Sequence, residues 1–254
     1  MNITYYPLLI FVLAVVGLGA SAWCGAWVLG RRRPLDDEVR SDFSTILAAT
    51  LTLLGLMIGF SFSMAVSRYD QRKDYEEAEA NAIGTAYVRA DLLPAGPAAA
   101  VRTLLSSYLD ERILAYTTND QSKLPEIDAR SAQLQADLWS AVHAPANANP
   151  TPVIALAVSG MNDVLNSQGY TQAANRNRIP TAAWVLLAAI AVCCNVLVGW
   201  GFHRRPGAAV LLVILPVVSA VAFMLIADID TPRHGIIRVQ PQNLISLAQS
   251  MRAN

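Results

Sequence analysis

Charged side chains are scarce in this chain of 254 residues: they make up 15% of it, whereas hydrophobic residues make up 54%. Ordinary soluble domains carry about a quarter charged residues. Lys plus Arg and Asp plus Glu each number 19, so the formal net charge is zero. The basic surface that binds nucleic acid is therefore missing. The composition indicates a membrane protein without a nucleic-acid partner.

Cysteine is also rare, and the common catalytic motifs are absent. Cys24, Cys193 and Cys194 all lie in apolar runs, where they form neither a disulfide framework nor a CxxC zinc motif. The three histidines are not spaced with Cys, Asp or Glu in a metal-binding pattern, and the sequence has no GxSxG, Walker or GxGxxG loop. We therefore expect no enzymatic activity, no cofactor and no metal site. We interpret Cys193 and Cys194 as small packing residues.

Long uncharged runs dominate what is present. They cover residues 5–30, 43–66, 179–202 and 206–227, and each exceeds the roughly 20 residues that a membrane-spanning helix needs. The first run lacks the basic start of a cleaved signal peptide. Ser41 and Asp42 are expected to cap the second. The sequence thus predicts a multi-pass protein of the inner cell membrane, with the lipid bilayer as its first partner.

The segment between the second and third spans is predicted to be helical throughout, because its apolar residues recur at helical spacing. The expected helices cover residues 68–93, 98–116, 125–142 and 152–170. The first break is Pro94-Ala-Gly-Pro97, the Pro- and Asn-rich stretch 144–151 precedes the last helix, and Thr151 is its expected N-cap.

The predicted fold class is all-α, with four parts along the chain. They are a first transmembrane hairpin (1–66), a helical extramembrane segment (67–178), a second transmembrane hairpin (179–230) and a C-terminal tail (231–254). Residues 236–239 of the tail look extended. Pro241 then opens a short amphipathic helix with an apolar side made of Leu244, Leu247, Ala248 and Met251.

The side of the membrane that carries residues 67–178 is ambiguous. Six basic residues lie in the two short loops at one end of the spans, and seven lie at the other end, mostly beside longer segments. Basic residues in short loops mark the cytoplasmic side, whereas long loops carry little weight. The charge pattern thus favours an external helical segment.

The second span carries a face of small residues. They recur at spacings of three and four, and they are Ser44, Ala48, Thr52, Gly55, Gly59 and Ser63. Such a face allows close packing of another helix, or it lines a pore in which small side chains leave room for water and ions. On the pore interpretation, Leu54, Ile58 and Phe62 form an apolar constriction; on the packing interpretation, they face lipid. Both interpretations stay open.

Charged residues are dense directly after this span. We interpret Glu76 and Glu77 as parts of a solvated helix face, and Glu79 and Asn81 as polar groups in a crowded region. If buried, these two need partners such as Arg89 or Arg68.

Two carboxylates end the fourth span. Asp228 and Asp230 stand at a helix C-terminus and therefore require a cation, for which Arg233 and Arg238 are the nearest candidates. An ion network at the membrane edge is the simpler interpretation, and a proton or ion site is the alternative.

Several segments together resemble a bacterial membrane family labelled bestrophin-like, formerly a domain of unknown function. They are residues 55–65 (GLMIGFSFSMA), 68–72 (RYDQR), 79–94 (EANAIGTAYVRADLLP) and 230–239 (DTPRHGIIRV). The usual aromatic after the proline of the last segment is replaced by arginine. The polar residues of these motifs are Arg68, Glu79, Asn81, Arg89, Asp91, Asp230 and Arg233.

The resemblance implies more about assembly and function than the residues alone do. Bestrophins have four membrane helices and a large helical segment after the second, and they are pentamers that conduct anions along the second helix past an apolar neck. A homo-oligomer and anions are thus the implied partners. No bestrophin calcium cluster aligns here, since Asp228 and Asp230 alone do not make one. Bestrophins keep the large segment in the cytoplasm, opposite to the side that the charge pattern favours.

Two functions therefore remain as hypotheses. The first is an oligomeric ion channel, anion-selective by resemblance, with the second span lining the pore. The second is a non-conducting scaffold or sensor in the membrane, with a helical segment that binds a partner or ligand.

Overall fold

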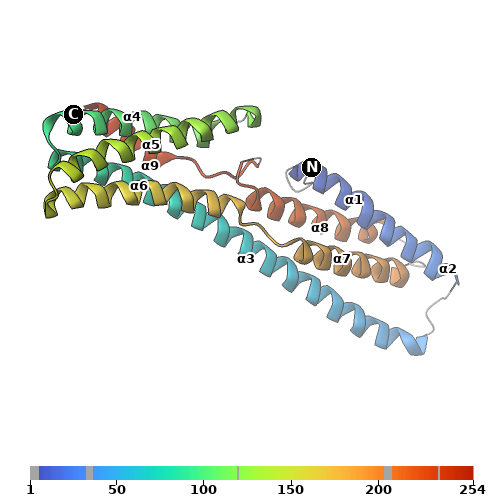
Figure 1. Cartoon of the computed structure of the whole chain (residues 1–254). Helices are drawn as coiled ribbons and strands as arrows, with labels where there is room; N and C mark the ends of the chain where they lie inside the picture. Colours follow the sequence, from blue (N-terminus) through green and yellow to red (C-terminus); the bar gives the residue numbers. More distant parts are fainter. Residues whose placement is uncertain (1–5, 33–36, 119, 203–207, 234, 254) are drawn as a thin grey trace. The chain divides into compact units, whose positions relative to one another are not determined.

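We analysed a computed structural model of the chain, which describes residues 6–32, 37–118, 120–202, 208–233 and 235–253 (Figure 1). The described secondary structure is helical, and four helices are long and apolar enough to cross a membrane. The predicted all-α fold with four membrane helices is confirmed. The chain divides into two compact units. We call Met1–Arg68 with Arg178–Arg238 the membrane unit, and Tyr69–Asn177 with Val239–Asn254 the helical unit.

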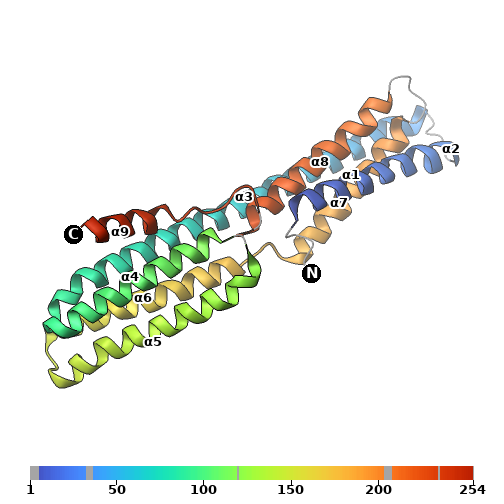
Figure 2. The same ribbon diagram turned by 90° about the horizontal axis from the view of Figure 1, so that it is seen from above.

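The membrane unit contains α1 (Pro7–Cys24), the first part of α3 (Asp37–Arg89), α7 (Thr181–Phe202) and α8 (Ala208–Asp230). Helix α1 packs along both α7 and α8, as both views show (Figures 1 and 2). Leu54 of α3 joins their core. The other buried members of this core are Leu18, Leu187, Ala191, Cys194 and Phe223.

Helices α1 and α7 touch backbone to backbone. A Cβ built on Gly25 would lie 2.1 Å from the carbonyl oxygen of Val196, and one on Gly199 would lie 2.0 Å from that of Ala22. Only glycine permits such an approach. At this contact, α1 changes into a π-helical turn, η2 (Gly25–Leu29), which leads into the short α2 (Gly30–Arg32).

Helix α3 is longer than the sequence suggests, because it joins the predicted helices 43–66 and 68–93 into one. Residues 60–83 contain neither Gly nor Pro, so nothing ends the helix there. Its start at Asp37 also places Ser41 and Asp42 inside the helix, and the prediction that they cap it is wrong. The helix ends through a 3-10 turn, η3 (Ala90–Leu92), just before Pro94.

The helical unit combines the last part of α3 with α4 (Ala95–Thr117), α5 (Leu124–Ala148), α6 (Pro152–Arg176) and α9 (Gln242–Ala253). Helix α5 follows α4 through the 3-10 turn η4 (Gln121–Lys123). Figure 2 shows α4, α5 and α6 lying side by side. The core contains one face of α4, where apolar residues recur at helical spacing, and one side of α9. Its fully buried members include Val101, Leu105, Tyr108, Leu109, Leu138, Met161 and Leu244.

Several local predictions are confirmed and others corrected. Thr151 caps α6, since its side-chain oxygen accepts a hydrogen bond from the Ile154 N–H at 3.2 Å. Helix α5 runs past the predicted break at 144 and includes Pro145 in its last turn, where the proline side chain is buried. Residues 236–239 look extended in sequence but form no strand: Ile236 and Ile237 lie in a bend, and Arg238 and Val239 have no regular secondary structure.

Candidate functional site

The small-residue flank of α3 is uncovered in the described part of the chain. Its residues are all exposed, and they are Ser44, Ala48, Thr52, Gly55, Gly59 and Ser63. A Cβ built on Gly55 or Gly59 would meet no heavy atom within 4 Å. Close packing of this flank therefore requires a second molecule. Packing and pore lining both remain predictions.

The predicted apolar ridge turns gradually from the core to the surface. Leu54 is 2% exposed in the core, Ile58 is half-buried against the same core, and Phe62 is 38% exposed. The reason is geometric: four residues advance an α-helix by about 400°, so each step along the ridge rotates the side chain by about 40°. Leu54 does not lie on the open flank, and a constriction built from all three residues does not fit this helix. Phe62 is the member that reaches the open side.

A second flank of α3 is open but wholly apolar. Phe60 is 65% exposed, and Leu53, Leu56 and Met64 are exposed with it. The open half of the helix thus has two chemically different flanks, one of small and hydroxyl-bearing residues and one of large apolar residues. Large apolar side chains suit lipid, where no polar partner is offered. This difference identifies the small-residue flank as the more specific surface.

Asn195 of α7 is a buried polar residue that the sequence analysis did not single out. Its side chain is fully buried, and its amide donates a hydrogen bond to the Ala191 carbonyl at 2.8 Å. Among the described residues its Oδ1 has no donor. A lone Asn within the uncharged run 179–202 is the signal that could have revealed it. Polar groups inside a membrane bundle favour helix association when they are paired.

The two carboxylates at the end of α8 have separate partners. Asp230 accepts a hydrogen bond from the Ile179 N–H at 3.2 Å, and its Oδ1 lies 3.7 Å from Nη1 of Arg68. Asp228 accepts bonds at 2.9 Å from the N–H groups of Ile236 and Ile237. Both carboxylates therefore stabilise the membrane edge of the fold. Among the described residues, no three His, Cys, Asp or Glu side chains gather as a metal site.

Glu76 is buried, so its interpretation as a solvated residue is wrong, whereas Glu77 is exposed. The carboxylate of Glu76 accepts hydrogen bonds from the Leu244 N–H at 3.0 Å and from the Asn243 side chain at 2.6 Å. These donors belong to the first turn of α9. A carboxylate there satisfies free N–H groups and complements the helix dipole. Glu76 thus attaches the C-terminal helix to α3.

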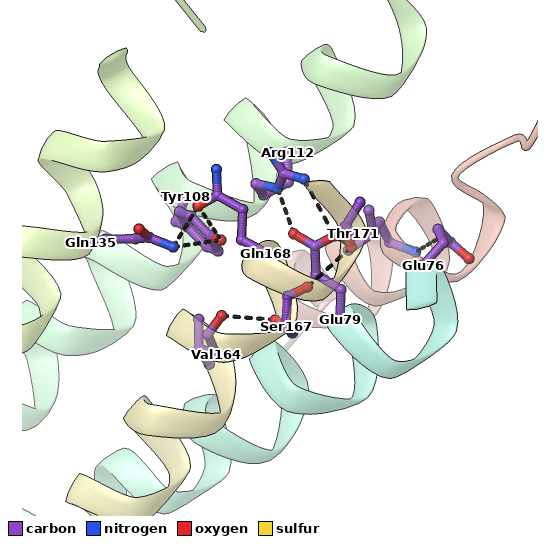
Figure 3. Close-up of polar contacts among 10 residues, drawn as sticks. Glu76, Glu79, Tyr108, Arg112, Gln135, Val164, Ser167, Gln168 and Thr171 are labelled. Carbon is purple, nitrogen blue, oxygen red and sulfur yellow. Dashed lines mark hydrogen bonds and ion pairs between the residues drawn. The ribbon is translucent and has the colours of Figure 1, made fainter. Parts of the chain in front are cut away.

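Glu79 is the centre of a buried polar network in the helical unit (Figure 3). It is fully buried, and it forms an ion pair with Arg112 of α4, which is also buried. The Thr171 hydroxyl of α6 donates a hydrogen bond to Glu79 at 3.2 Å. The expectation that a buried Glu79 needs a cation is thus met by Arg112, and not by the predicted Arg89 or Arg68. Arg112 lies 33 residues away in sequence, so local spacing did not indicate it.

The charge of this network changes the acidity of its neighbours. Burial raises the pKa of Tyr108 and of Tyr116, and the Glu79 carboxylate raises both further. Burial alone would lower the pKa of Arg112, but the adjacent Glu79 carboxylate more than offsets this, so the pKa is raised. Tyr108 also lies within hydrogen-bond reach of Gln135 and Gln168. The net result keeps Arg112 charged and both tyrosines neutral at neutral pH, although the hydrogen bond with Gln135 acts to lower the pKa of Tyr108.

Of the remaining motif residues, Arg233 belongs to the membrane unit and is half-buried, and the other three lie at the surface of the helical unit. Arg89 donates to the Leu156 carbonyl at 3.4 Å, and Asp91 forms an exposed ion pair with Arg102. Asn81 is exposed and lines an open groove of about 580 Å³ between α3 and α9, with Asn243 among its other lining residues. Asn81 is therefore not one of the buried polar groups.

Comparison with known proteins places these features in a family. The family model described as "Bestrophin-like domain" matches residues 11–244. No curated protein sequence matches the chain.

Solved structures of a bacterial bestrophin homolog from Klebsiella pneumoniae are similar in fold. One, with a tryptophan-to-alanine substitution, is 11% identical with a TM-score of 0.66, and the alignment covers 100% of this chain and 96% of that one. Another, phased with zinc, is 14% identical with a TM-score of 0.65 and coverages of 96% and 95%. The predicted resemblance is thus confirmed over nearly the whole length, and the chain belongs to the bestrophin-like family.

Proposed function

We propose that the protein is an oligomeric ion channel of the inner cell membrane, in which copies of the small-residue flank of α3 enclose a central path. The proposal rests on the exposure of this flank in the described part of the chain. It runs within a membrane-spanning segment, it bears no charge, and the Cβ positions at Gly55 and Gly59 are open. One flank of one helix cannot enclose a path, so several copies must supply the wall.

Anions are the proposed ions, since bestrophins conduct anions and this chain belongs to the bestrophin-like family. The flank carries no acidic residue that would repel them. Small and hydroxyl-bearing side chains leave space for water around a passing ion.

The narrowest part of the path is proposed at Phe62. Its ring lies at the rim of the open flank, where the ridge from Leu54 reaches the surface. A ring of such side chains from several copies excludes water, and an ion then meets a barrier from lost hydration. The narrow site is thus apolar rather than charged.

Planar-bilayer recording of purified protein tests the proposal, because α3 offers a matched pair of phenylalanines. Phe62 lies at the small-residue flank, whereas Phe60 lies on the apolar flank and is also exposed. We expect Phe62→Ala to raise the basal conductance several-fold by widening the constriction. Phe60→Ala should leave it unchanged. In a chloride gradient, the reversal potential should lie near the chloride equilibrium potential.

Two results contradict the proposal. One is the absence of current from wild type and Phe62→Ala when both are folded and inserted. The other is a particle image that has no ring of subunits around a central hole. A reversal potential that indicates cation selectivity would support the channel proposal but contradict the proposal that it conducts anions.

The groove between α3 and α9 favours the second hypothesis, a scaffold or sensor. Both apolar and polar side chains line it, and the polar ones include Asn81, Thr85 and Arg89. Binding of a ligand or partner there, by a protein that carries no current, would support that function.

A further inference from the structure

An exposed column of two tryptophans and an arginine marks the end of α1. Trp23 and Trp27 are 63% and 50% exposed, and their rings stack with centroids 5.6 Å apart and an interplanar angle of 11°. The guanidinium carbon of Arg31 lies 4.6 Å from the centroid of the Trp27 ring. Three large side chains therefore stand in line on the outer surface of the membrane unit.

The π-helical turn explains why this line stays straight. In an uninterrupted α-helix, residues at i and i+8 are rotated apart by about 80°. The turn Gly25–Leu29 uses i→i+5 hydrogen bonds and takes more residues per turn, which counteracts that rotation. Gly25, the first residue of this turn, is buried against Val196 of α7. The π-helical turn is thus fixed on one side by close packing against α7, and on the other side it aligns the column.

The sequence around the column is typical of the boundary between lipid tails and headgroups. The uncharged run 5–30 ends at Gly30, and Arg31 is the first of three consecutive arginines. Tryptophan favours this boundary because its ring is apolar and its N–H is polar. Among the described residues, Arg31 pairs with no carboxylate, and its contact is the ring of Trp27. Stacking occupies the face of a guanidinium and leaves its N–H edge available.

We propose that Trp23, Trp27 and Arg31 bind the headgroup phosphate of an anionic phospholipid. The planar fork of N–H donors in arginine matches two phosphate oxygens, and the tryptophan rings cover the glycerol and upper chain region. A choline headgroup fits less well, because a quaternary ammonium needs a free aromatic face. Here the Trp27 ring is stacked against Trp23 and covered by Arg31. The proposal does not rest on ion conduction.

Quenching of tryptophan fluorescence by brominated lipids tests it in a background with Trp139, Trp184 and Trp200 replaced by Phe, which serves as wild type here. Trp23 and Trp27 are then the only tryptophans in the sequence. The protein is reconstituted in bilayers of phosphatidylcholine and phosphatidylglycerol, with either lipid brominated in turn. The ratio of quenching measures the preference for the anionic lipid. We expect a preference of about fivefold in wild type, which corresponds to one basic side chain at an anionic surface.

Variants at Arg31 leave the two tryptophans in place. Arg31→Gln should reduce the preference to near one, and Arg31→Lys should keep only part of it, since lysine has the charge without the planar fork. Arg130→Gln, an exposed position on α5, removes the same charge from the helical unit and should change nothing. Equal thermal stability of the variants verifies their folding. The proposal is wrong if wild type shows no preference, or if Arg31→Gln retains that of wild type.

Discussion

Replacing Gly199 by alanine should destabilise the membrane unit strongly, because the added methyl group has no space. The Cβ would lie 2.0 Å from the Ala22 carbonyl oxygen and 2.9 Å from the Ala26 nitrogen. Ordinary contacts of a Cβ begin at 3.4 Å, so α1 and α7 would have to separate by more than 1 Å. Both obstacles are backbone atoms, which cannot move aside as a flexible side chain can.

The expected cost follows from the rigidity of packed helices. Overpacking a core costs about 1 to 3 kcal/mol, and two backbone obstacles place this substitution at the upper end of that range. We therefore expect a loss of about 3 kcal/mol. In a chain of this size, that lowers the midpoint of thermal unfolding by roughly 6 to 12 °C.

Thermal denaturation in detergent, followed by size-exclusion chromatography, measures this shift. Gly59→Ala is the matched control, because the same methyl group on α3 would meet nothing within 4 Å. Gly201→Ala should be intermediate, since its Cβ would meet the ring of Phe43, a side chain that can move. Equal midpoints for Gly199→Ala and Gly59→Ala would refute the close contact between α1 and α7.

The helical unit and the orientation of the chain yield three further predictions. Glu79→Ala should destabilise the protein by about 3 to 5 kcal/mol, because it leaves Arg112 buried without its carboxylate; a thermal midpoint equal to that of a substitution at exposed Glu77 would contradict this. Tyr108 and Tyr116 should resist ionisation above their ordinary pKa of 10.0 while the unit is folded. Because their folded pKa is raised, the two tyrosines stabilise the folded protein below pH 10, and this stabilisation is lost at higher pH. Absorbance at 295 nm during alkaline titration should therefore show that they ionise together with unfolding. Ionisation of two tyrosines besides the exposed ones before the protein unfolds would contradict this. A membrane-impermeant thiol reagent should label exposed Ser122→Cys in intact cells if the charge of the short loops governs insertion, and labelling only after lysis would establish the bestrophin-like orientation.

The membrane helices and most of the other helices were predictable from the sequence, because local composition determines them. An uncharged run of 20 or more residues has few stable forms in lipid other than a helix, and the apolar stripe of α4 follows helical spacing wherever it packs. The N-cap of Thr151 depends on a bond within three residues and is confirmed for the same reason. The family resemblance also rested on contiguous motifs.

The helix boundaries were less predictable where the sequence has no helix-breaking residue, or where the helix continues through one. Nothing in residues 60–83 breaks the helix, yet the change from apolar to charged composition suggested two helices where α3 is one. The sequence predicts that the helix over 125–142 ends before the Pro- and Asn-rich stretch 144–151, whereas α5 continues to Ala148. A proline in the last turn removes only one backbone bond, and the side chain of Pro145 is buried.

The partners of polar residues were decided only by tertiary structure. Glu79 pairs with Arg112 and Glu76 with the start of α9, across 33 and 168 residues of sequence. Local spacing carries no information about such distant contacts. The orientation of the ridge at Leu54 likewise depends on which side of α3 meets the core.

The sequence by itself determined that this chain is a helical membrane protein of the bestrophin-like family, because hydrophobicity and short motifs are local properties. Only the tertiary structure separated Gly25 and Gly199, at a backbone contact, from Gly55 and Gly59, on an open flank. All four are glycines in apolar helices, and their sequence surroundings do not distinguish them. The difference comes from the rotation of each helix against its neighbours, which the whole packed unit sets.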